Sequence, residues 1–295
     1  MTEVLAIFGP TSVGKTGVVV AVAERLRARG EDPVAVNCDA IQVYRGLEVL
    51  SGAASPEEQA RLEHRLVSFV PIGEEFSAGR FAGLAHGEID SLLEQGRRPI
   101  VVGGTGLYLR AALADLDLRP PVPAAIRDQV EREIAERGPE ALHAELDPDI
   151  AATVHPNDRK RIARWTELER AGVTPPASSE RLWTERLRHP TLLFGLTLDR
   201  DELARRIDAR VEAMVATGAV EEARNAAASA SRTAAAALGF EELIAADIDG
   251  VKTAHRRYAR RQLTWLRKME DVRMIDRAGR GDDEVAAEIV AHLGD

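Results

Sequence analysis

Eight residues near the start of the chain, Gly9 to Thr16, constrain the fold more than any other stretch. They read GPTSVGKT and match the pattern G-x-x-x-x-G-K-[ST]. A short apolar run, Val4 to Phe8, precedes them, and a helical pattern of apolar residues that ends near Gly30 follows them. A strand, a glycine-rich loop and a helix in this order let backbone N–H groups surround phosphate oxygens at the positive end of the helix. The motif therefore predicts a P-loop core that binds a di- or triphosphate.

The chemical groups of this loop suit such a ligand. Lys15 supplies a mobile positive charge, and the hydroxyl of Thr16 is placed to ligate Mg²⁺. The alternative is a glycine-rich turn with an incidental lysine, and the flanking strand and helix argue against it. We predict that the phosphate groups are held by Gly9, Thr11, Ser12, Val13, Gly14, Lys15 and Thr16.

Further apolar runs predict strands at residues 34–36, 99–102 and 191–198. Short, continuously apolar strands that alternate with helices indicate a parallel sheet covered on both faces. Residues 119–188 carry no strand-like run, and their apolar residues recur at helical spacing. We therefore predict an α/β fold with a P-loop NTPase-like parallel sheet core, formed by 1–118 and 189–295, and a helical insertion domain at 119–188.

Two polar residues follow predicted strands, at the sheet edge where ligands bind in open α/β folds. Asp39 comes just after the second strand, and its carboxylate suits a general base, a Mg²⁺ ligand, a helix N-cap or a solvated surface position. Thr105 lies in the sequence GGTG at 103–106, where glycines permit close approach of the backbone to a ligand. A plain turn with Thr105 as N-cap is the alternative. Gln42 and Tyr44 add an amide and a phenol that suit recognition of a base or a ribose.

A basic segment near the C-terminus indicates an anionic partner. Residues 255–268 contain six Arg or Lys residues and no acid. At helical spacing Tyr258, Gln262 and Trp265 share one face, which we interpret as core packing rather than base stacking. A solvated face normally mixes both signs of charge, so a nucleic-acid backbone or a substrate phosphate is the favoured partner. A second basic cluster, at 159–164, lies in the predicted insertion.

Composition excludes several classes of protein. The 295-residue chain has a formal charge of −9, so any nucleic-acid binding must use local basic patches. The single cysteine, Cys38, excludes an internal disulfide and a zinc site built from cysteines. Neither a signal peptide nor a run of 18 apolar residues is present, so we expect a cytoplasmic protein with no membrane attachment.

Taken in order along the chain, these motifs resemble those of the tRNA dimethylallyltransferases, also called tRNA isopentenyltransferases. The resemblance covers most of the chain, and the combination of motifs is far more specific than any one of them. They are GPTSVGKT at 9–16, NCDAIQVYRG at 37–46, the stretch 98–113 around GGTGLY, HPNDRKRIAR at 155–164, RIDARVEAMVATGAVEEA at 206–223, ALGFEEL at 237–243 and RRYARRQLTWLRK at 256–268.

The resemblance implies transfer of a dimethylallyl group from dimethylallyl diphosphate to N6 of the adenine 3′ of the anticodon in tRNA, with release of diphosphate. The phosphate loop would hold diphosphate rather than ATP, with Mg²⁺ on Thr16 and with Arg210 as a further ligand. Asp39 would accept the N6 proton, and Lys15 and Thr105 would act beside the leaving group. The insertion would bind the anticodon stem-loop. The residues implied to contact tRNA are Asp39, Ala40, Ile41, Gln42, Thr105, Arg127, Lys160, Arg161, Arg164, Arg256 and Arg260.

Four positions depart from the family pattern. Ala40 replaces a serine, Arg65 a histidine, Glu241 a lysine, and Trp165 interrupts a common Arg-Ala-Leu. Because no departure removes a loop or catalytic residue, we expect the chemistry to be kept and tRNA binding to be the property that changes.

Three other functions compete with this reading. A prenyltransferase acting on free adenine nucleotides, as in cytokinin-forming relatives, would have little use for the insertion and the basic clusters. A P-loop kinase of a small substrate would need an arginine-rich lid, and the insertion is the one candidate. A non-catalytic tRNA- or nucleotide-binding protein would retain the fold without the turnover. For an enzyme whose partner is a large RNA, we expect a monomer.

Overall fold

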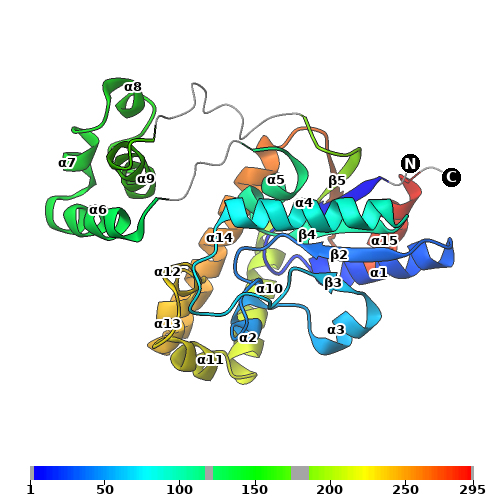
Figure 1. Cartoon of the computed structure of the whole chain (residues 1–295). Helices are drawn as coiled ribbons and strands as arrows, with labels where there is room; N and C mark the ends of the chain where they lie inside the picture. The colour runs from blue at the N-terminus through cyan, green and yellow to red at the C-terminus, as the bar shows by residue number, and fades with distance from the viewer. Residues whose placement is uncertain (1–2, 117–121, 174–185, 294–295) are drawn as a thin grey trace. The chain divides into compact units, whose positions relative to one another are not determined.

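The computed structural model describes residues 3–116, 122–173 and 186–293 (Figure 1). The chain divides into two compact units, a core unit of Met1–Leu116 with Trp183–Asp295 and an insertion unit, Asp117–Leu182. The predicted insertion extends to residue 188, whereas Arg188 belongs to the core unit. Its guanidinium pairs with Asp90 and Asp115 at 2.9 and 2.8 Å, and its backbone N–H donates to the Leu113 carbonyl.

A six-stranded, all-parallel sheet forms the centre of the core unit. Across the sheet the strands run β3 (His64–Arg65), β2 (Pro33–Asn37), β4 (Arg98–Gly103), β1 (Val4–Phe8), β5 (Thr191–Thr197) and β6 (Val272–Asp276). The predicted α/β class is confirmed, and the apolar runs correspond to β1, β2, β4 and β5. The sequence did not predict β3 and β6, because β3 has two residues and β6 is an edge strand that carries charged side chains.

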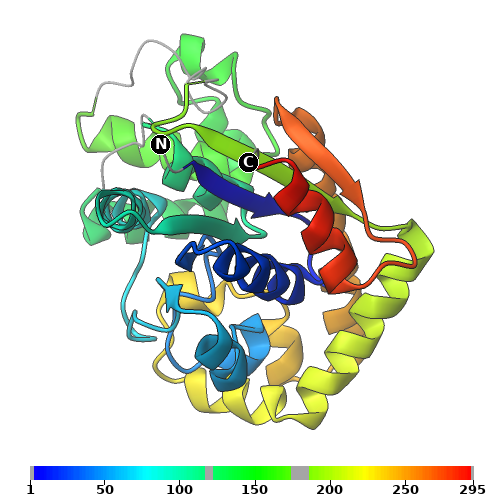
Figure 2. The ribbon, with the colours of Figure 1, turned by 90° about the vertical axis from the view of Figure 1, so that its right-hand side faces the viewer.

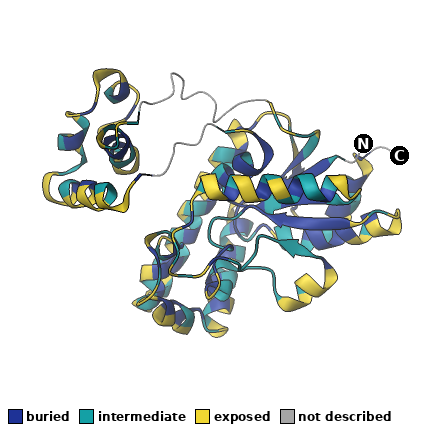
Figure 3. Cartoon of the chain, in the orientation of Figure 1, coloured by how far each residue is buried: buried dark blue, intermediate teal, exposed yellow. Residues whose placement is uncertain are grey.

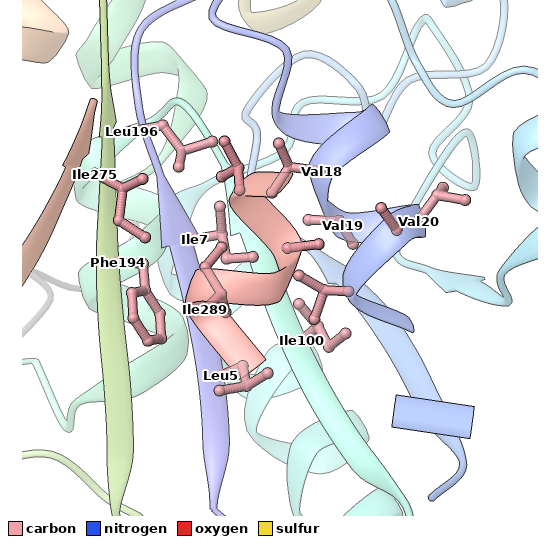
Figure 4. Packing of buried hydrophobic residues seen from close by; sticks show 14 of the residues in the cluster. Leu5, Ile7, Val18, Val19, Val20, Ile100, Phe194, Leu196, Ile275 and Ile289 are labelled. Carbon is pink, nitrogen blue, oxygen red and sulfur yellow. The ribbon is translucent and has the colours of Figure 1, made fainter. Parts of the chain in front are cut away.

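Helices cover both faces of this sheet (Figures 1 and 2). On one face α1 (Lys15–Ala28) packs against α15 (Asp282–Ala291), and on the other α4 (Ala78–Glu94) packs against α5 (Gly106–Leu113). Leu5 and Ile7 of β1 are completely buried beneath Val18 and Val19 of α1 and Ile289 of α15 (Figures 3 and 4). Burial of each such side chain contributes about 2 kcal/mol to the stability of the fold. The phosphate loop therefore rests on a well-packed apolar layer.

The chain after β5 is mainly helical and returns to the sheet at β6. Its longer helices are α10 (Arg200–Ala216) and α14 (Ile248–Lys268), which pack against each other. Two ion pairs join them, Arg256 to Asp208 and Lys252 to Glu212, each at 2.6 Å. The shorter helices of the core unit are α2 (Glu48–Ser51), α3 (Pro56–Arg61), α11 (Ala219–Ala226), α12 (Arg232–Ala235) and α13 (Phe240–Ile244).

The insertion unit is helical and has a core of its own. It contains α6 (Ala124–Arg137), α7 (Pro139–His143), α8 (Pro148–Ala151) and α9 (Arg159–Arg170). Apolar residues at helical spacing on α6 and α9 pack together, among them Val130, Ile134, Ile162 and Trp165. Asp158 caps α9 by accepting a hydrogen bond from the backbone N–H of Arg161 at 3.2 Å.

Among the helices that the structure describes, none has the length and apolar character needed to cross a membrane.

Candidate functional site

Three loops meet at the carboxyl edge of the sheet because the strands before them are neighbours. The phosphate loop follows β1, Asp39 follows β2 and Thr105 follows β4. Strand β4 pairs with both β1 and β2, and its C-terminal residues lie beside the ends of both strands. The backbone N–H of Ala40 also donates to Oγ1 of Thr105 at 3.2 Å. The topology thus brings together the residues that the motifs single out separately.

The phosphate loop leaves a set of hydrogen-bond donors without partners. Within the described chain, no group accepts a hydrogen bond from the backbone N–H of Ser12, Gly14, Lys15 or Thr16. The hydroxyl of Ser12 is also buried and has no partner. Ser12 and Gly14 adopt φ of +63° and +89°, which turns successive N–H groups to one side. Donors gathered in this way at a helix N-terminus fit an anionic ligand.

Two of the predicted phosphate ligands use their backbone N–H groups elsewhere. The N–H of Thr11 donates to Oε1 of Gln262 at 2.8 Å, and the N–H of Val13 donates to the Pro10 carbonyl at 3.3 Å. Thr11 therefore supports the loop, and the free donors lie at Ser12 and at the start of α1.

Two cations border these donors. Nζ of Lys15 donates to the carbonyls of Gly9 and Pro10, both at 3.0 Å, and burial lowers the pKa of Lys15 to about 8 even though Asp39 opposes this shift. Arg210 reaches in from α10 and donates to Oγ1 of Thr11 at 2.8 Å, and burial also lowers its pKa. In the described part of the chain neither cation hydrogen-bonds a carboxylate, so an anion would supply the missing counter-charge.

Asp39 and Thr105 face each other across this edge. Oδ1 of Asp39 accepts hydrogen bonds from the N–H groups of Ile41 and Gln42, at 3.0 and 3.5 Å, and Oδ2 lies 3.4 Å from Oγ1 of Thr105. Asp39 therefore caps a turn and not a helix. Thr105 occupies the N-cap position of α5, but its hydroxyl makes no cap hydrogen bond and turns toward Asp39 and Tyr258. Oδ2 thus accepts one long hydrogen bond, from Thr105, and Asp39 is half-exposed, so this oxygen can accept from a further donor.

The phosphate loop and the Asp39–Thr105 pair belong to one site. A Cβ on Gly104 would lie 3.4 Å from Nζ of Lys15 and 2.2 Å from Nε2 of Gln262. The residue before Thr105 therefore lies near the lysine of the phosphate loop, and the approach of the Gln262 amide is what leaves no room for a side chain at position 104.

Three residues of the site escaped the sequence analysis. Gln262 bridges two loops, and the hydroxyl of Tyr258 lies 3.3 Å from both Oγ1 of Thr105 and the Gly104 carbonyl. The sequence places Gln262 and Tyr258 on one face of a predicted helix, but core packing produces the same pattern, so the pattern alone does not mark them as site residues. Arg277, only 4% exposed, donates to the carbonyls of Val13 and Gly14 at 2.6 and 3.1 Å. No sequence signal marks Arg277, because it lies far from the motif along the chain.

The residues after Asp39 differ in where they point. Nε2 of Gln42 donates to the Gly52 carbonyl at 2.9 Å, beside Ser51, whose carbonyl accepts from Arg210. Tyr44 is 1% exposed and its hydroxyl bonds Oγ1 of Thr233 at 2.5 Å. The predicted use of Tyr44 in recognition of a base or a ribose is therefore wrong.

The basic residues implied to contact tRNA fall on three helices. In the insertion unit Lys160 is exposed, and the Arg161 guanidinium lies 3.5 Å from the Asp158 carboxylate. Arg164 pairs with the buried Glu167 at 3.0 Å. Arg127 is half-buried on α6 and donates to the Val122 carbonyl. On α14 of the core unit, Arg260 is exposed. The guanidinium of Arg256 is already paired with Asp208.

The side chains around the loop fit one type of metal site. The described residues hold no group of three or more His, Cys, Asp or Glu side chains able to bind a metal ion. The Thr16 hydroxyl is half-exposed at the start of α1, and no described residue hydrogen-bonds it. Mg²⁺ commonly takes one or two protein ligands together with phosphate oxygens and water. The site therefore suits a Mg²⁺ ion that arrives with a phosphate ligand.

Comparison with known proteins gives a consistent result. Residues 42–269 match the family model described as IPP transferase, and residues 2–69 match that of isopentenyl transferase. A tRNA dimethylallyltransferase of Anaeromyxobacter sp. (strain Fw109-5) is 42% identical over 93% of this chain and 95% of its own length. One from Geobacillus thermodenitrificans is 37% identical over 94% and 91%. The crystal structure of the full-length tRNA isopentenylpyrophosphate transferase from Bacillus halodurans has a TM-score of 0.71 and 31% identity, and the match covers 99% of this chain and 96% of that one.

Proposed function

The chain belongs to the IPP transferase family, and on that premise we propose that it transfers a dimethylallyl group from dimethylallyl diphosphate to N6 of the adenine 3′ of the anticodon in tRNA, releasing diphosphate. One observation carries the proposal. A set of donors that have no partner among the described residues, with two half-buried cations, Lys15 and Arg210, borders a carboxylate, Asp39, through the Gly104–Thr105 turn. Such a site suits a reaction that expels an anion at one end and releases a proton at the other.

The anion-binding half of the site stabilises the leaving group. As N6 of adenine bonds to the allylic carbon, the bond from that carbon to the diphosphate oxygen breaks and its electron pair passes to the diphosphate. The N–H groups of Ser12, Gly14, Lys15 and Thr16, together with the Lys15 and Arg210 side chains, meet the charge that develops. Because these groups are already oriented before the reaction, little reorganisation is needed.

The carboxylate half of the site takes up the proton. When N6 forms its new bond to carbon it becomes positively charged and must lose a proton. Asp39 offers Oδ2 for this proton, while its Oδ1 is held by the Ile41 N–H. Thr105 and Tyr258 form a hydrogen-bonded pair beside Oδ2 and keep the carboxylate oriented. Burial raises the pKa of Tyr258, so Tyr258 stays a neutral hydroxyl.

We propose Mg²⁺ as the cofactor, bound by the Thr16 hydroxyl and by diphosphate oxygens. When bound, Mg²⁺ would neutralise part of the charge on the leaving group. The lack of a carboxylate cluster among the described residues favours an ion that enters with the substrate.

Residues 39–42 and Thr105 are proposed to contact the adenine, and the tRNA backbone is proposed to be bound by basic residues outside this site. Lys160, Arg161, Arg164 and Arg127 of the insertion unit are proposed to contact the anticodon stem-loop, with Arg256 and Arg260 of α14. Arg256 would keep its pairing with Asp208, so Arg260 is the freer of the two on α14. In an acidic protein, these clusters suit a phosphate backbone. We propose that the enzyme acts as a monomer in the cytoplasm.

One assay distinguishes tRNA from free adenine nucleotides as the acceptor. Purified protein with Mg²⁺ and labelled dimethylallyl diphosphate is given a tRNA transcript, the same transcript with guanine in place of the adenine 3′ of the anticodon, or AMP. We expect label in the first transcript alone. Label in AMP alone would move the chain to the nucleotide-modifying class, and label in neither acceptor would contradict the proposed activity.

A further inference from the structure

We propose that Gln262 is a positioning residue that fixes the distance between the phosphate loop and the Gly104–Thr105 turn, and so keeps the leaving diphosphate in register with the attacking amine. The inference rests on the proposed function for the identity of the two reacting groups. It rests on the contacts of Gln262 itself for the link between the two loops. Gln262 would touch neither substrate and would act through Thr11 and Gly104.

The Gln262 amide is used on both sides. Its Oε1 accepts a hydrogen bond from the backbone N–H of Thr11 at 2.8 Å, and its Nε2 donates to the Gly104 carbonyl at 2.7 Å. The side chain is 3% exposed, so water does not compete for either bond. Thr11 offers only a donor and Gly104 only an acceptor at these positions, so the bridge needs a side chain with one acceptor and one donor. Among side chains of this length, only glutamine provides both.

The first hydrogen bond determines which donors remain for the ligand. With its N–H directed to Gln262 and its hydroxyl accepting from Arg210, Thr11 joins α14 and α10 to the loop. The N–H groups of Ser12 and of residues 14–16 are then left for the anion. Gln262 therefore also fixes the position of Arg210 relative to those donors.

The second hydrogen bond places the acceptor side of the site. Gly104 directly precedes Thr105, whose hydroxyl lies 3.4 Å from Oδ2 of Asp39. Tyr258, one turn earlier on α14, approaches both the Gly104 carbonyl and the Thr105 hydroxyl at 3.3 Å. The same helix thus holds the turn at two points, and Gln262 also extends across to the phosphate loop. A displacement of about 1 Å between reacting groups can cost roughly 10²-fold in rate.

Two substitutions separate the hydrogen bonds from the charge. Gln262→Met keeps the length of the side chain and removes both bonds, so the two loops lose their fixed spacing. Gln262→Glu keeps the acceptor for Thr11 but places a carboxylate oxygen against the Gly104 carbonyl. Because Lys15 Nζ approaches the same glycine, that carboxylate would also compete with diphosphate for Lys15.

The control removes packing from the same helix without touching either loop. Leu266 is buried one turn after Gln262 and packs near Gly195 of β5. Leu266→Ala therefore loosens α14 and lowers Tm while both hydrogen bonds of Gln262 remain. The readouts are kcat and KM per folded enzyme, the Kd of inorganic diphosphate, and hydrogen exchange at the Thr11 amide.

A positioning role predicts a specific pattern. Gln262→Met should lower kcat at least 10-fold, change the diphosphate Kd by less than 5-fold, and speed Thr11 exchange at least 10-fold, all relative to Leu266→Ala. Gln262→Glu should in addition weaken diphosphate binding at least 10-fold. If Gln262→Met stays within 3-fold of the Leu266→Ala control in kcat and in Thr11 exchange, the proposal is overturned.

Failure of the proposed function would look different. A wild-type protein that modifies no tRNA would refute the prenyl-transfer reaction, whereas the diphosphate affinity and the Thr11 exchange would still judge the bridge. Unchanged Thr11 exchange in Gln262→Met would overturn the bridge whatever the reaction proves to be.

Discussion

At the residue scale, the defining feature is a half-buried lysine that hydrogen-bonds no carboxylate among the described residues. In the part of the chain that the structure describes, Lys15 donates to the carbonyls of Gly9 and Pro10, and a second cation, Arg210, lies in the same surroundings. Desolvation is the main cause of its lowered pKa, while Asp39 partly offsets it. An anion bound at the loop would reverse that shift, so ligand binding and protonation of Lys15 are linked.

This linkage predicts how diphosphate binding depends on pH. In the free protein the pKa of Lys15 is about 8, so below pH 8 the lysine is charged both before and after binding. Above pH 8 binding must take up a proton, and the Kd should rise by up to about tenfold per pH unit. Titration calorimetry between pH 6.5 and 9.5 measures this. Lys15→Arg stays charged throughout this range, so its diphosphate Kd changes with pH only through ionisation of diphosphate and serves as the control. If the Kd of the two proteins depends on pH in the same way, the linkage is refuted.

How much of the site the sequence predicts depends on how the residues are connected. Lys15, Thr16, Asp39 and Thr105 stand in local motifs directly after strands, so the spacing of those motifs was enough to select them. Gln262 and Arg277 act from elements more than 250 residues away from the loop they hold. Their contacts depend on the strand order and on helix packing. Nothing in local spacing encodes these contacts.

At the element scale, α14 packs against the turn that carries Thr105 and holds it by hydrogen bonds. Its residues Tyr258, Gln262 and Trp265 recur at helical spacing and face Gly104 to Gly106. A Cβ on Gly106 would lie 2.4 Å from the ring of Trp265. The basic character of α14 and its packing face are thus separate features of one helix.

The close approach of α14 and α5 predicts opposite effects for two glycine substitutions. Gly106→Ala should destabilise the protein by about 1–3 kcal/mol, because the new methyl group overlaps the Trp265 ring. Gly87→Ala should stabilise it by about 0.5–1 kcal/mol, because Gly87 lies inside α4 with no atom near its Cβ position. Thermal unfolding measures both. Equal Tm shifts in the two variants would show that the helices do not meet as described.

The elements themselves were predictable where burial dominates the sequence pattern. Strands β1, β2 and β4 are almost entirely apolar and were found within two residues of their ends. Edge strand β6 mixes charged and apolar residues, and its position in the sheet is defined by its pairing with β5 rather than by its composition. The sequence correctly predicts that Tyr258, Gln262 and Trp265 share one face of α14. It does not predict that this face contacts the turn at Gly104 to Gly106.

At the scale of the whole molecule, the chemistry lies in one unit and several of the proposed RNA contacts lie in the other. The core unit holds the phosphate loop, Asp39 and Thr105, whereas the insertion unit has its own apolar core and carries the basic start of α9. Arg188 lies on the core side of this division, where it pairs with Asp90 and Asp115. This division predicts that tRNA binding and diphosphate binding can be altered independently.

Removal of one positive charge from the insertion tests that division. Lys160→Gln should weaken tRNA binding about 3- to 10-fold and lower the salt dependence of binding by about one ion, while diphosphate binding stays unchanged. Arg273→Gln, which removes an exposed charge from β6 of the core unit, is the matched control. The division fails if both variants weaken tRNA binding equally or if Lys160→Gln weakens diphosphate binding.

The most direct test of the account is the behaviour of Asp39→Asn in single-turnover transfer to tRNA, measured together with diphosphate affinity. Asparagine retains an oxygen for the Ile41 N–H, so the turn is kept while the proton acceptor is lost. We predict that the rate falls at least 10²-fold. Diphosphate should bind equally well or more tightly, because a negative charge near Lys15 is removed. Transfer within tenfold of the wild-type rate, or a parallel loss of transfer and diphosphate binding, would contradict the account.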